Sequence, residues 1–185
     1  MPAHEDTPTP LHGRRVAFLA TDGVERVELV EPWKAVQDAG GRPELISPRP
    51  DRITSFDRLD PGATFPVDVE VAGADPDAYD ALVLPGGVAN PDQLRTDSDA
   101  VAFVRAFVDG GRPVAAICHA PWLLVEADAV EGRTLTSYPS LATDLRNAGA
   151  TWVDETVHVE GGLITSRNPD DLPAFCEALV RELTR

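Results

Sequence analysis

Cys118 and His119 stand where an apolar strand should give way to a helix. Residues 113–117 predict a buried strand, and Pro121 suits the first turn of the helix that follows. A sharp strand-to-helix turn exposes its central side chain, and nearby helix N–H groups favour a thiolate there. The pattern indicates that Cys118 is a nucleophile on an elbow with a lowered thiol pKa. The alternative is a small core residue, the commoner role of a free cysteine.

Other strand ends should meet Cys118 at the same edge of the sheet. Residues 80–84 predict a strand that ends in Pro85, Gly86 and Gly87. Glycines after a strand let backbone N–H groups approach a ligand, so Gly86 and Gly87 could donate to an oxyanion beside the N–H of His119. An ordinary turn is the simpler interpretation of the pair, but its position at the Cys118 edge favours a functional role.

A second histidine offers a competing arrangement. His158 and Glu160 lie two residues apart, as in the triad of glutamine amidotransferases, and would share one face of a strand. Gly161 and Gly162 follow, and then another apolar segment, a pattern typical of a hairpin with an exposed polar face. We therefore expect His158 to lie outside the catalytic site.

The remaining pattern predicts alternating strands and helices. The expected strands are 15–20, 43–47, 80–84, 114–117, 135–137 and 163–165, and the expected helices are 28–39, 97–108, 141–147 and 171–183. Residues 49–75 suggest short extended pieces at one edge of the sheet. This alternation favours an α/β fold with a mostly parallel sheet covered on both faces, whose ligands bind at the carboxyl ends of the strands.

Length and composition set further bounds. The 185 residues are enough for one domain, which we place at 12–185 after a flexible tail at 1–11. The formal charge of −15 argues against nucleic acid or anionic membranes as partners. Lys34 is the single lysine, and of the two cysteines Cys176 fits a packed position on the last helix. No disulfide framework, signal peptide or membrane-spanning segment is evident, so we expect a reducing, cytoplasmic location.

Three segments together resemble the PfpI family of the class I glutamine amidotransferase-like superfamily, which includes intracellular proteases and the parkinsonism-associated deglycases. They are residues 20–25 (ATDGVE), 80–87 (DALVLPGG) and 114–121 (VAAICHAP). Residues 165–172 add a fourth matching segment, and the resemblance covers nearly all of 14–183. It implies a flavodoxin-like three-layer sandwich with a cysteine nucleophile elbow.

The resemblance also implies roles for single residues. Cys118 matches the family nucleophile, and His119 matches the histidine that follows it. Glu25, rather than Glu28, matches the glutamic acid that hydrogen-bonds the cysteine. A buried carboxylic acid there should keep its proton and donate to the sulfur. Asp92 is the best match to an acidic residue that reaches a neighbouring subunit's site. Ala120 stands where glycine is usual, which narrows the turn slightly.

These residues support several reactions, none of which needs a cofactor or metal. The first is attack of Cys118 on a small reactive carbonyl or a glycated group, as in a glyoxalase or deglycase that protects against stress. The second is peptide hydrolysis through an acyl-enzyme. The third is a redox sensor or holdase in which the thiol is oxidised. We expect a homodimer or higher homo-oligomer, as is general in the family, with Trp122 and the Asp92 loop near its boundary.

Overall fold

The structure, a computed structural model, describes residues 9–185. Residues 1–8 of the tail expected at 1–11 lie outside the described part of the chain. Leu11, however, is fully buried, and its N–H donates to Ala39 O at 2.8 Å. The prediction of a loose segment up to residue 11 is therefore wrong for Leu11, which is an apolar side chain that the core takes up.

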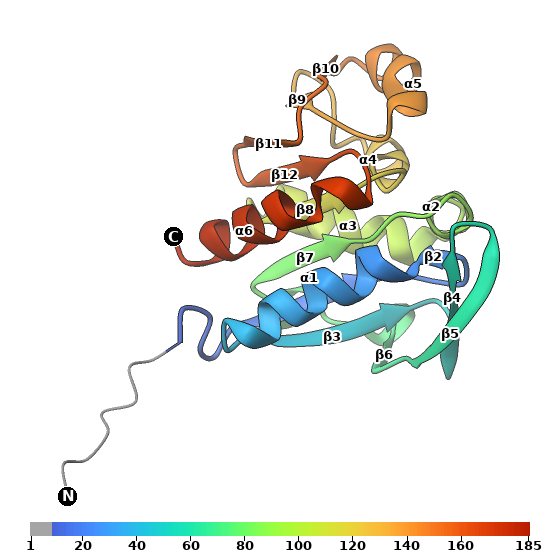
Figure 1. Cartoon of the computed structure of the whole chain (residues 1–185), viewed down its shortest axis with the longest axis vertical. Coiled ribbons are helices and arrows are strands. Elements are labelled where there is room, and N and C mark those ends of the chain that lie inside the picture. Colours follow the sequence, from blue (N-terminus) through green and yellow to red (C-terminus); the bar gives the residue numbers. More distant parts are fainter. Residues whose placement is uncertain (1–8) are drawn as a thin grey trace, which may run out of the picture.

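A seven-stranded sheet with the order β11-β12-β8-β7-β1-β3-β6 forms the centre of the fold (Figure 1). Its strands are β1 (Arg15–Leu19), β3 (Arg42–Ser47), β6 (Val69–Glu70), β7 (Ala81–Leu84), β8 (Val114–Ile117), β11 (Val157–Glu160) and β12 (Leu163–Ser166). All neighbours pair in parallel except β11, which runs antiparallel to β12. The parallel strands thus end at one shared edge.

Helices cover both faces of this sheet. Alternate side chains of β1 enter different cores: Phe18 packs on the side of α1 (Arg26–Asp38) and α6 (Leu172–Leu183), and Leu19 on the side of α3 (Ser98–Asp109) and α4 (Pro121–Glu126). In Figure 1, α1 and α6 lie in front of the sheet and α3 lies behind it. This is the predicted flavodoxin-like three-layer sandwich, and it is confirmed.

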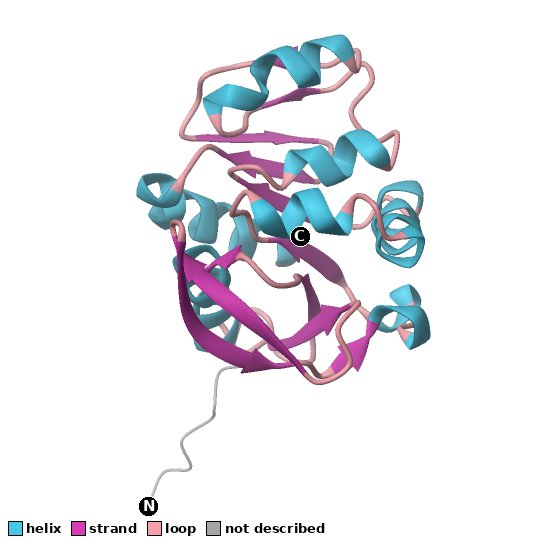
Figure 2. Ribbon diagram, turned by 90° about the vertical axis from the view of Figure 1, so that its right-hand side faces the viewer, coloured by secondary structure: helices cyan, strands magenta, loops and turns pink. Residues whose placement is uncertain are grey.

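A second, three-stranded sheet with the order β2-β4-β5 stands beside the first. It consists of β2 (Val24–Glu25), β4 (Arg52–Asp57) and β5 (Asp60–Pro66), and Figure 2 shows its two long strands as a hairpin. We expected residues 49–75 at the edge of the main sheet, but only β6 joins it. Backbone pairing of Gly23 N with Thr54 O (2.9 Å) instead ties the hairpin to the loop after β1.

Shorter elements complete the chain. They are α2 (Ala89–Leu94), α5 (Ala142–Asn147), the pair β9 (Thr134–Leu135) and β10 (Thr151–Trp152), and four 3₁₀ turns, η1 (Val71–Gly73), η2 (Pro76–Ala78), η3 (Pro139–Leu141) and η4 (Pro169–Asp171). Within residues 9–185, no helix combines the length and the apolar character needed to cross a membrane.

Candidate active site

Cys118 occupies the turn between β8 and α4. Its backbone has a φ of +65°, in the left-handed region that non-glycine residues rarely adopt. The N–H of Cys118 still pairs with Ser166 O of β12 at 3.0 Å, so the strand continues up to this residue and then turns abruptly. The predicted sharp turn is thus present, but the side chain is only 7% exposed rather than open to solvent.

His119 lies against the cysteine. Its Nδ1 is 3.1 Å from Cys118 Sγ and its Nε2 is 3.4 Å from Ser140 Oγ. The imidazole stacks on Tyr138 with ring centroids 4.5 Å apart. Burial lowers the pKa of His119, so the ring is neutral at pH 7. A neutral imidazole beside a sulfur atom is placed to accept or return a proton.

The carboxyl group beside Cys118 belongs to Glu28, which corrects the expectation for Glu25. Glu28 is 0% exposed, and its Oε2 accepts a 2.9 Å hydrogen bond from the N–H of Gly86. A Cβ added to Gly86 would collide with both Glu28 Oε2 and Cys118 Cβ, which shows how closely the three residues pack. The physical reason is helix geometry: α1 begins at Arg26, so Glu28 falls on the helix stripe that faces the sheet.

Glu25 lies at the mouth of the site instead. It is half-buried, precedes the first residue of α1, and its Oε2 accepts from the N–H of Arg58 at 3.0 Å. Arg58 is at the tip of the β4-β5 hairpin with a φ of +62°. Glu25 therefore contacts the hairpin and not the sulfur.

Burial dominates the acid–base properties of the reactive pair. It raises the pKa of Glu28 to about 8, although contact with Cys118 and the N–H groups of Gly86 and Gly87 act in the opposite direction. Burial also raises the pKa of the Cys118 thiol, as does the charge of Glu28, whereas the N–H groups of Gly87 and His119 lower it. The expected lowering of the thiol pKa by the turn alone is therefore wrong, because desolvation outweighs it.

The two glycines have different roles. The N–H of Gly86 is committed to Glu28, so the structure does not offer it as an oxyanion donor. The N–H of Gly87 lies close to both the sulfur and the Glu28 carboxyl group, and it lowers the pKa of each. Gly87 has a φ of +82°, and a Cβ there would collide with Gly23 O and Glu25 N. Only glycine fits this close approach of two loops.

Asn90 holds these loops together, and sequence reasoning missed it. The buried side chain accepts from Thr21 N at 2.7 Å and donates to Pro85 O and Gly86 O at 3.0 and 3.1 Å. It thereby joins the loop after β1 to the loop after β7. An asparagine three residues after a Gly-Gly turn was the available signal, since Asn often bonds to nearby backbone.

A cavity of about 840 Å³ opens above the reactive residues. Cys118, His119, Glu28, Glu25 and Gly87 all line it. Leu59, Val88 and Tyr138 line its mouth and are the large apolar side chains found exposed in the described chain, Leu59 at 82%. The structure thus brings most of the predicted site residues to one hollow.

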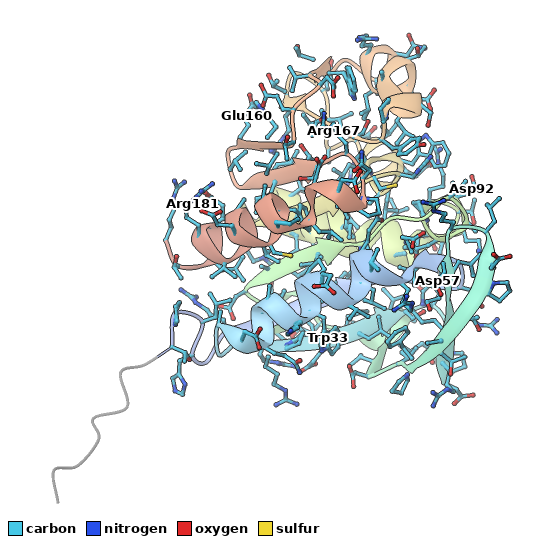
Figure 3. The ribbon with its side chains drawn as sticks, viewed as in Figure 1. Trp33, Asp57, Asp92, Glu160, Arg167 and Arg181 are labelled. Atoms are coloured by element: carbon cyan, nitrogen blue, oxygen red, sulfur yellow. The ribbon has the colours of Figure 1, made fainter. Side chains whose placement is uncertain are left out.

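Asp92 does not reach this cavity. It lies on α2 and is exposed, because residues 89–94 form a helix where we expected a loop. Figure 3 places Asp92 and Asp57 on the same side of the molecule, whereas Glu160 lies on the other side. Any role of Asp92 at a Cys118 site would therefore need a second subunit.

The competing histidine lies outside the site, as expected. His158 Nδ1 pairs with Glu155 Oε2 at 2.7 Å, and Glu160 accepts from Thr134 N at 2.9 Å, so the two side chains bind different groups. Neither lines the cavity. Cys176 is half-buried against the α1-α6 core and lines a separate groove with Lys34.

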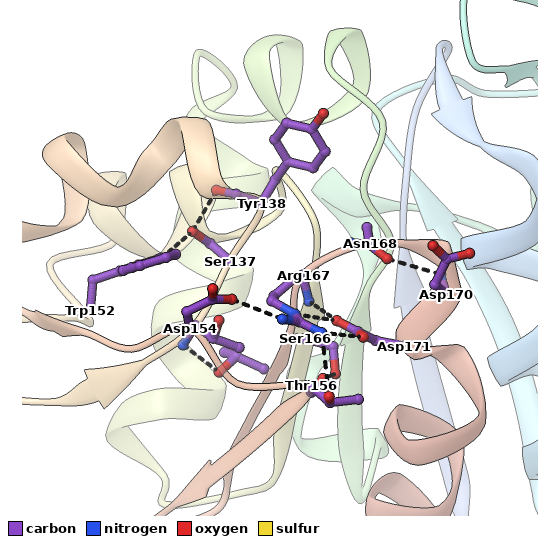
Figure 4. A network of polar contacts seen from close by, with 12 residues as sticks. Ser137, Tyr138, Trp152, Asp154, Thr156, Ser166, Arg167, Asn168, Asp170 and Asp171 are labelled. Atoms are coloured by element: carbon purple, nitrogen blue, oxygen red, sulfur yellow. Dashed lines mark hydrogen bonds and ion pairs between the residues drawn. The ribbon is translucent and has the colours of Figure 1, made fainter.

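A polar network supports the far wall of the cavity (Figure 4). Asp171 is 3% exposed and receives Arg167 Nε and Arg167 N–H at 2.9 and 3.0 Å, while Asp154 Oδ1 receives Arg167 Nη1 at 2.8 Å. This fixes the segment that carries Asn168 and Asp170, both of which line the cavity. Among residues 9–185, no group of His, Cys, Asp and Glu side chains has an arrangement suited to a metal ion.

Comparison with known proteins shows what this arrangement resembles. Residues 14–182 match the sequence model of the DJ-1/PfpI family. A deglycase of Thermococcus kodakarensis is 38% identical over 169 residues, which cover 91% of this chain and 99% of the relative. Protein/nucleic acid deglycase 2 of Escherichia coli is 39% identical over 171 residues, covering 92% and 98%.

A solved structure shows the same fold. It is a two-domain protein from Anabaena variabilis with DJ-1/ThiJ/PfpI-like and ferritin-like domains, 33% identical, with a TM-score of 0.87. The match covers 92% of this chain and 48% of that one, so this chain spans about half of the two-domain protein.

Proposed function

Because this chain belongs to the DJ-1/PfpI family, we propose that it is a cofactor-independent enzyme whose Cys118 attacks reactive carbonyl groups, as a glyoxalase or deglycase. The observation that carries the proposal is the contact of one sulfur with two proton-holding groups, His119 and Glu28, at the base of an open cavity. The similarity to relatives named deglycase supports the same class of reaction.

Glu28 and Cys118 hold their protons as a coupled pair. Two negative charges in one buried site repel each other, so the pair releases one proton well before the second. The pKa of about 8 at Glu28 puts that first release close to neutral pH. Below that pH Glu28 keeps its proton and adds no charge that opposes a thiolate. Burial still raises the thiol pKa, but the N–H groups of Gly87 and His119 face the sulfur and lower it, and His119 Nδ1, 3.1 Å from Sγ, is placed to take the thiol proton.

The thiolate then adds to the aldehyde carbon of an α-oxoaldehyde. A carbon–sulfur bond forms, the carbonyl π bond breaks, and its oxygen takes a proton to give a hemithioacetal. His119 removes the remaining hydrogen of that carbon as a proton, and a proton is returned at the adjacent carbon, which becomes the hydroxyl-bearing centre. Water cleaves the resulting thioester and releases a 2-hydroxy acid and the thiol. The substrate supplies both the oxidised and the reduced carbon.

The same steps remove an early glycation adduct. There the carbon attacked by sulfur carries the substrate's amino group, which leaves as the free amine. The cavity of about 840 Å³ has room for an adduct on a larger body, and its mouth offers the apolar side chains of Leu59, Val88 and Tyr138. The net charge of −15 favours adducts on small molecules or polypeptides over those on nucleic acids.

Turnover of methylglyoxal and of a methylglyoxal-treated peptide, measured beside casein hydrolysis, tests the proposal. Carbonyl loss by the wild type that disappears in Cys118→Ala and persists in Cys176→Ser is the expected result. Casein hydrolysis that depends on Cys118 would instead select a peptidase. If neither activity depends on Cys118, the enzymatic proposal fails and a thiol-based sensor or chaperone takes its place.

A further inference from the structure

Two carboxyl groups at and just before the start of α1 face the reactive cavity. Both line it: Glu28 lies in the first turn of α1, and Glu25 is the extended residue immediately before the helix. Glu28 is fully buried beside Cys118. Glu25 is half-buried, and its carboxylate is held by the N–H of Arg58. The mechanism above uses Glu28 and leaves Glu25 without a role.

We propose that Glu25 is a positioning residue with two effects: its negative charge keeps the proton on Glu28, and its carboxylate holds the hairpin tip over the cavity. The inference rests on the proposed function for its purpose, but both effects are properties of the folded protein. A negative charge near a buried carboxyl group opposes a second negative charge.

Other charged groups around Glu28 are arranged so that the effect of Glu25 is not cancelled. From the hairpin, Asp57 is paired with Arg26 Nε at 2.7 Å, and Arg58 contributes a cation that acts against Glu25. From η4, Asp170 lines the far side and is exposed. Cys118 contacts Glu28 directly, and His119 lies on the other side of the sulfur, 3.1 Å from Sγ. After burial, the charge of Glu25 is the largest influence that raises the pKa of Glu28.

Loss of the charge would thus shift the proton balance of the reactive pair. Without Glu25, ionised Glu28 is less strongly opposed, so Glu28 releases its proton at lower pH. An ionised Glu28 would then oppose the thiolate, because its charge raises the thiol pKa. Glu25 in this way helps to keep Glu28 neutral while the thiolate forms.

The second effect concerns the hairpin. The tip residue Arg58 has a φ of +62°, a strained backbone for arginine, and the bond from its N–H to Glu25 helps to hold it. Leu59 follows directly and lines the mouth of the cavity. Glutamine at position 25 keeps an oxygen that can accept from Arg58 but removes the charge, whereas alanine removes both. The two substitutions therefore separate the two effects.

The charge effect is tested by titrating Glu28 alone. In full-length Cys118→Ala protein with ¹³C-labelled glutamate, carbon NMR follows the Glu28 carboxyl group, identified by its loss in Glu28→Gln. Adding Glu25→Gln should lower the titration midpoint by roughly 0.5 to 1 pH unit. The matched control is Glu31→Gln, since Glu31 is also three residues from Glu28 on α1 but lines the other groove. An unchanged midpoint, or an equal shift in both variants, overturns the charge effect.

The holding effect is tested by amide hydrogen exchange at Arg58. Glu25→Ala should speed exchange of this N–H at least several-fold, and Glu25→Gln should leave it close to wild type. Equal protection in Glu25→Ala and wild type overturns this part. Both measurements are made without substrate, so their failure is distinct from failure of the proposed reaction.

Discussion

The N–H of Gly86 donates a 2.9 Å hydrogen bond to Glu28 Oε2, across 58 residues of sequence. This bond joins the first turn of α1 to the turn after β7, where the carboxyl group packs closely against Cys118. Two segments far apart in the sequence thus hold one carboxyl group beside the reactive sulfur.

Glu28 should lower the free energy of unfolding of the protein as the pH rises. Its pKa is about 8 in the folded protein and about 4.3 in an unfolded chain, so between these values only the unfolded state gives up the proton. The native state then binds more protons, and the free energy of unfolding falls with rising pH. Urea denaturation from pH 5 to 8 should therefore show Glu28→Gln gaining on the order of 3 kcal/mol relative to wild type. Parallel curves for the two proteins would contradict a buried, protonated Glu28; Glu31→Gln is the surface control.

The two thiols should react at different rates. Burial raises the pKa of both, that of Cys176 to about 11, but only Cys118 has a neutral imidazole beside it, His119 Nδ1 at 3.1 Å, that can take its proton. Iodoacetamide at pH 8, followed by peptide mapping, should label Cys118 before Cys176. Faster labelling of Cys176 would rule out Cys118 as the reactive thiol.

The two histidines should differ in their effect on turnover. His119 Nδ1 lies 3.1 Å from the sulfur, while His158 pairs with Glu155 on the far hairpin. His119→Ala should lower kcat for methylglyoxal by about 10² or more, the size typical of a lost acid–base group, and His158→Ala should not. The opposite pattern would favour a triad built on His158 and Glu160.

Asp171 should stabilise the fold at neutral pH and lose this effect in acid. Although burial acts in the other direction, hydrogen bonds from Arg167 lower the pKa of Asp171, so its contribution is present above an unfolded pKa of about 3.9 and is lost as pH falls through the lower folded value. Asp171→Asn should cost about 2 to 4 kcal/mol at pH 7 and progressively less below pH 4. Asp154→Asn, at the exposed end of the network, should cost about 1 kcal/mol or less. Equal losses in the two variants would show that burial of Asp171 does not matter.

Self-association should strengthen with salt. We expect at least a homodimer, and the charge of −15 opposes it by a repulsion that ions screen. Light-scattering mass across a salt series measures this directly. A monomer at every ionic strength would remove both the dimer and any action of Asp92 on a neighbouring site.

The sequence predicted the strands of the parallel sheet well, because residues such as those of β7 and β8 are buried on both faces and form apolar runs. Cys118 was found by the abrupt end of one such run. The prediction of Glu25 as the acid beside the cysteine was wrong. It rested on position within the motif and did not consider which residues of α1 face the sheet. Glu28, Leu29, Pro32 and Val36 form the buried stripe of α1, and an acidic residue within that stripe was the signal.

Other features depend on contacts between distant segments. Asn90 bonds to Thr21, and the hairpin pairs with the loop after β1, so neither follows from local pattern. Burial also decided the acid–base behaviour of Cys118 and Glu28, and exposure is fixed only when the layers pack. The roles of Asp92, the oligomeric state and the cytoplasmic location stay predictions.

The backbone of Cys118 has a further consequence for how this protein could evolve. At a φ of +65° a cysteine is strained, and glycine would relieve the strain at the cost of the thiol. Laboratory selection for heat resistance alone would therefore drift toward glycine at this position. Retention of the cysteine over generations would therefore indicate selection for catalysis, because at this position stability favours glycine and catalysis requires cysteine.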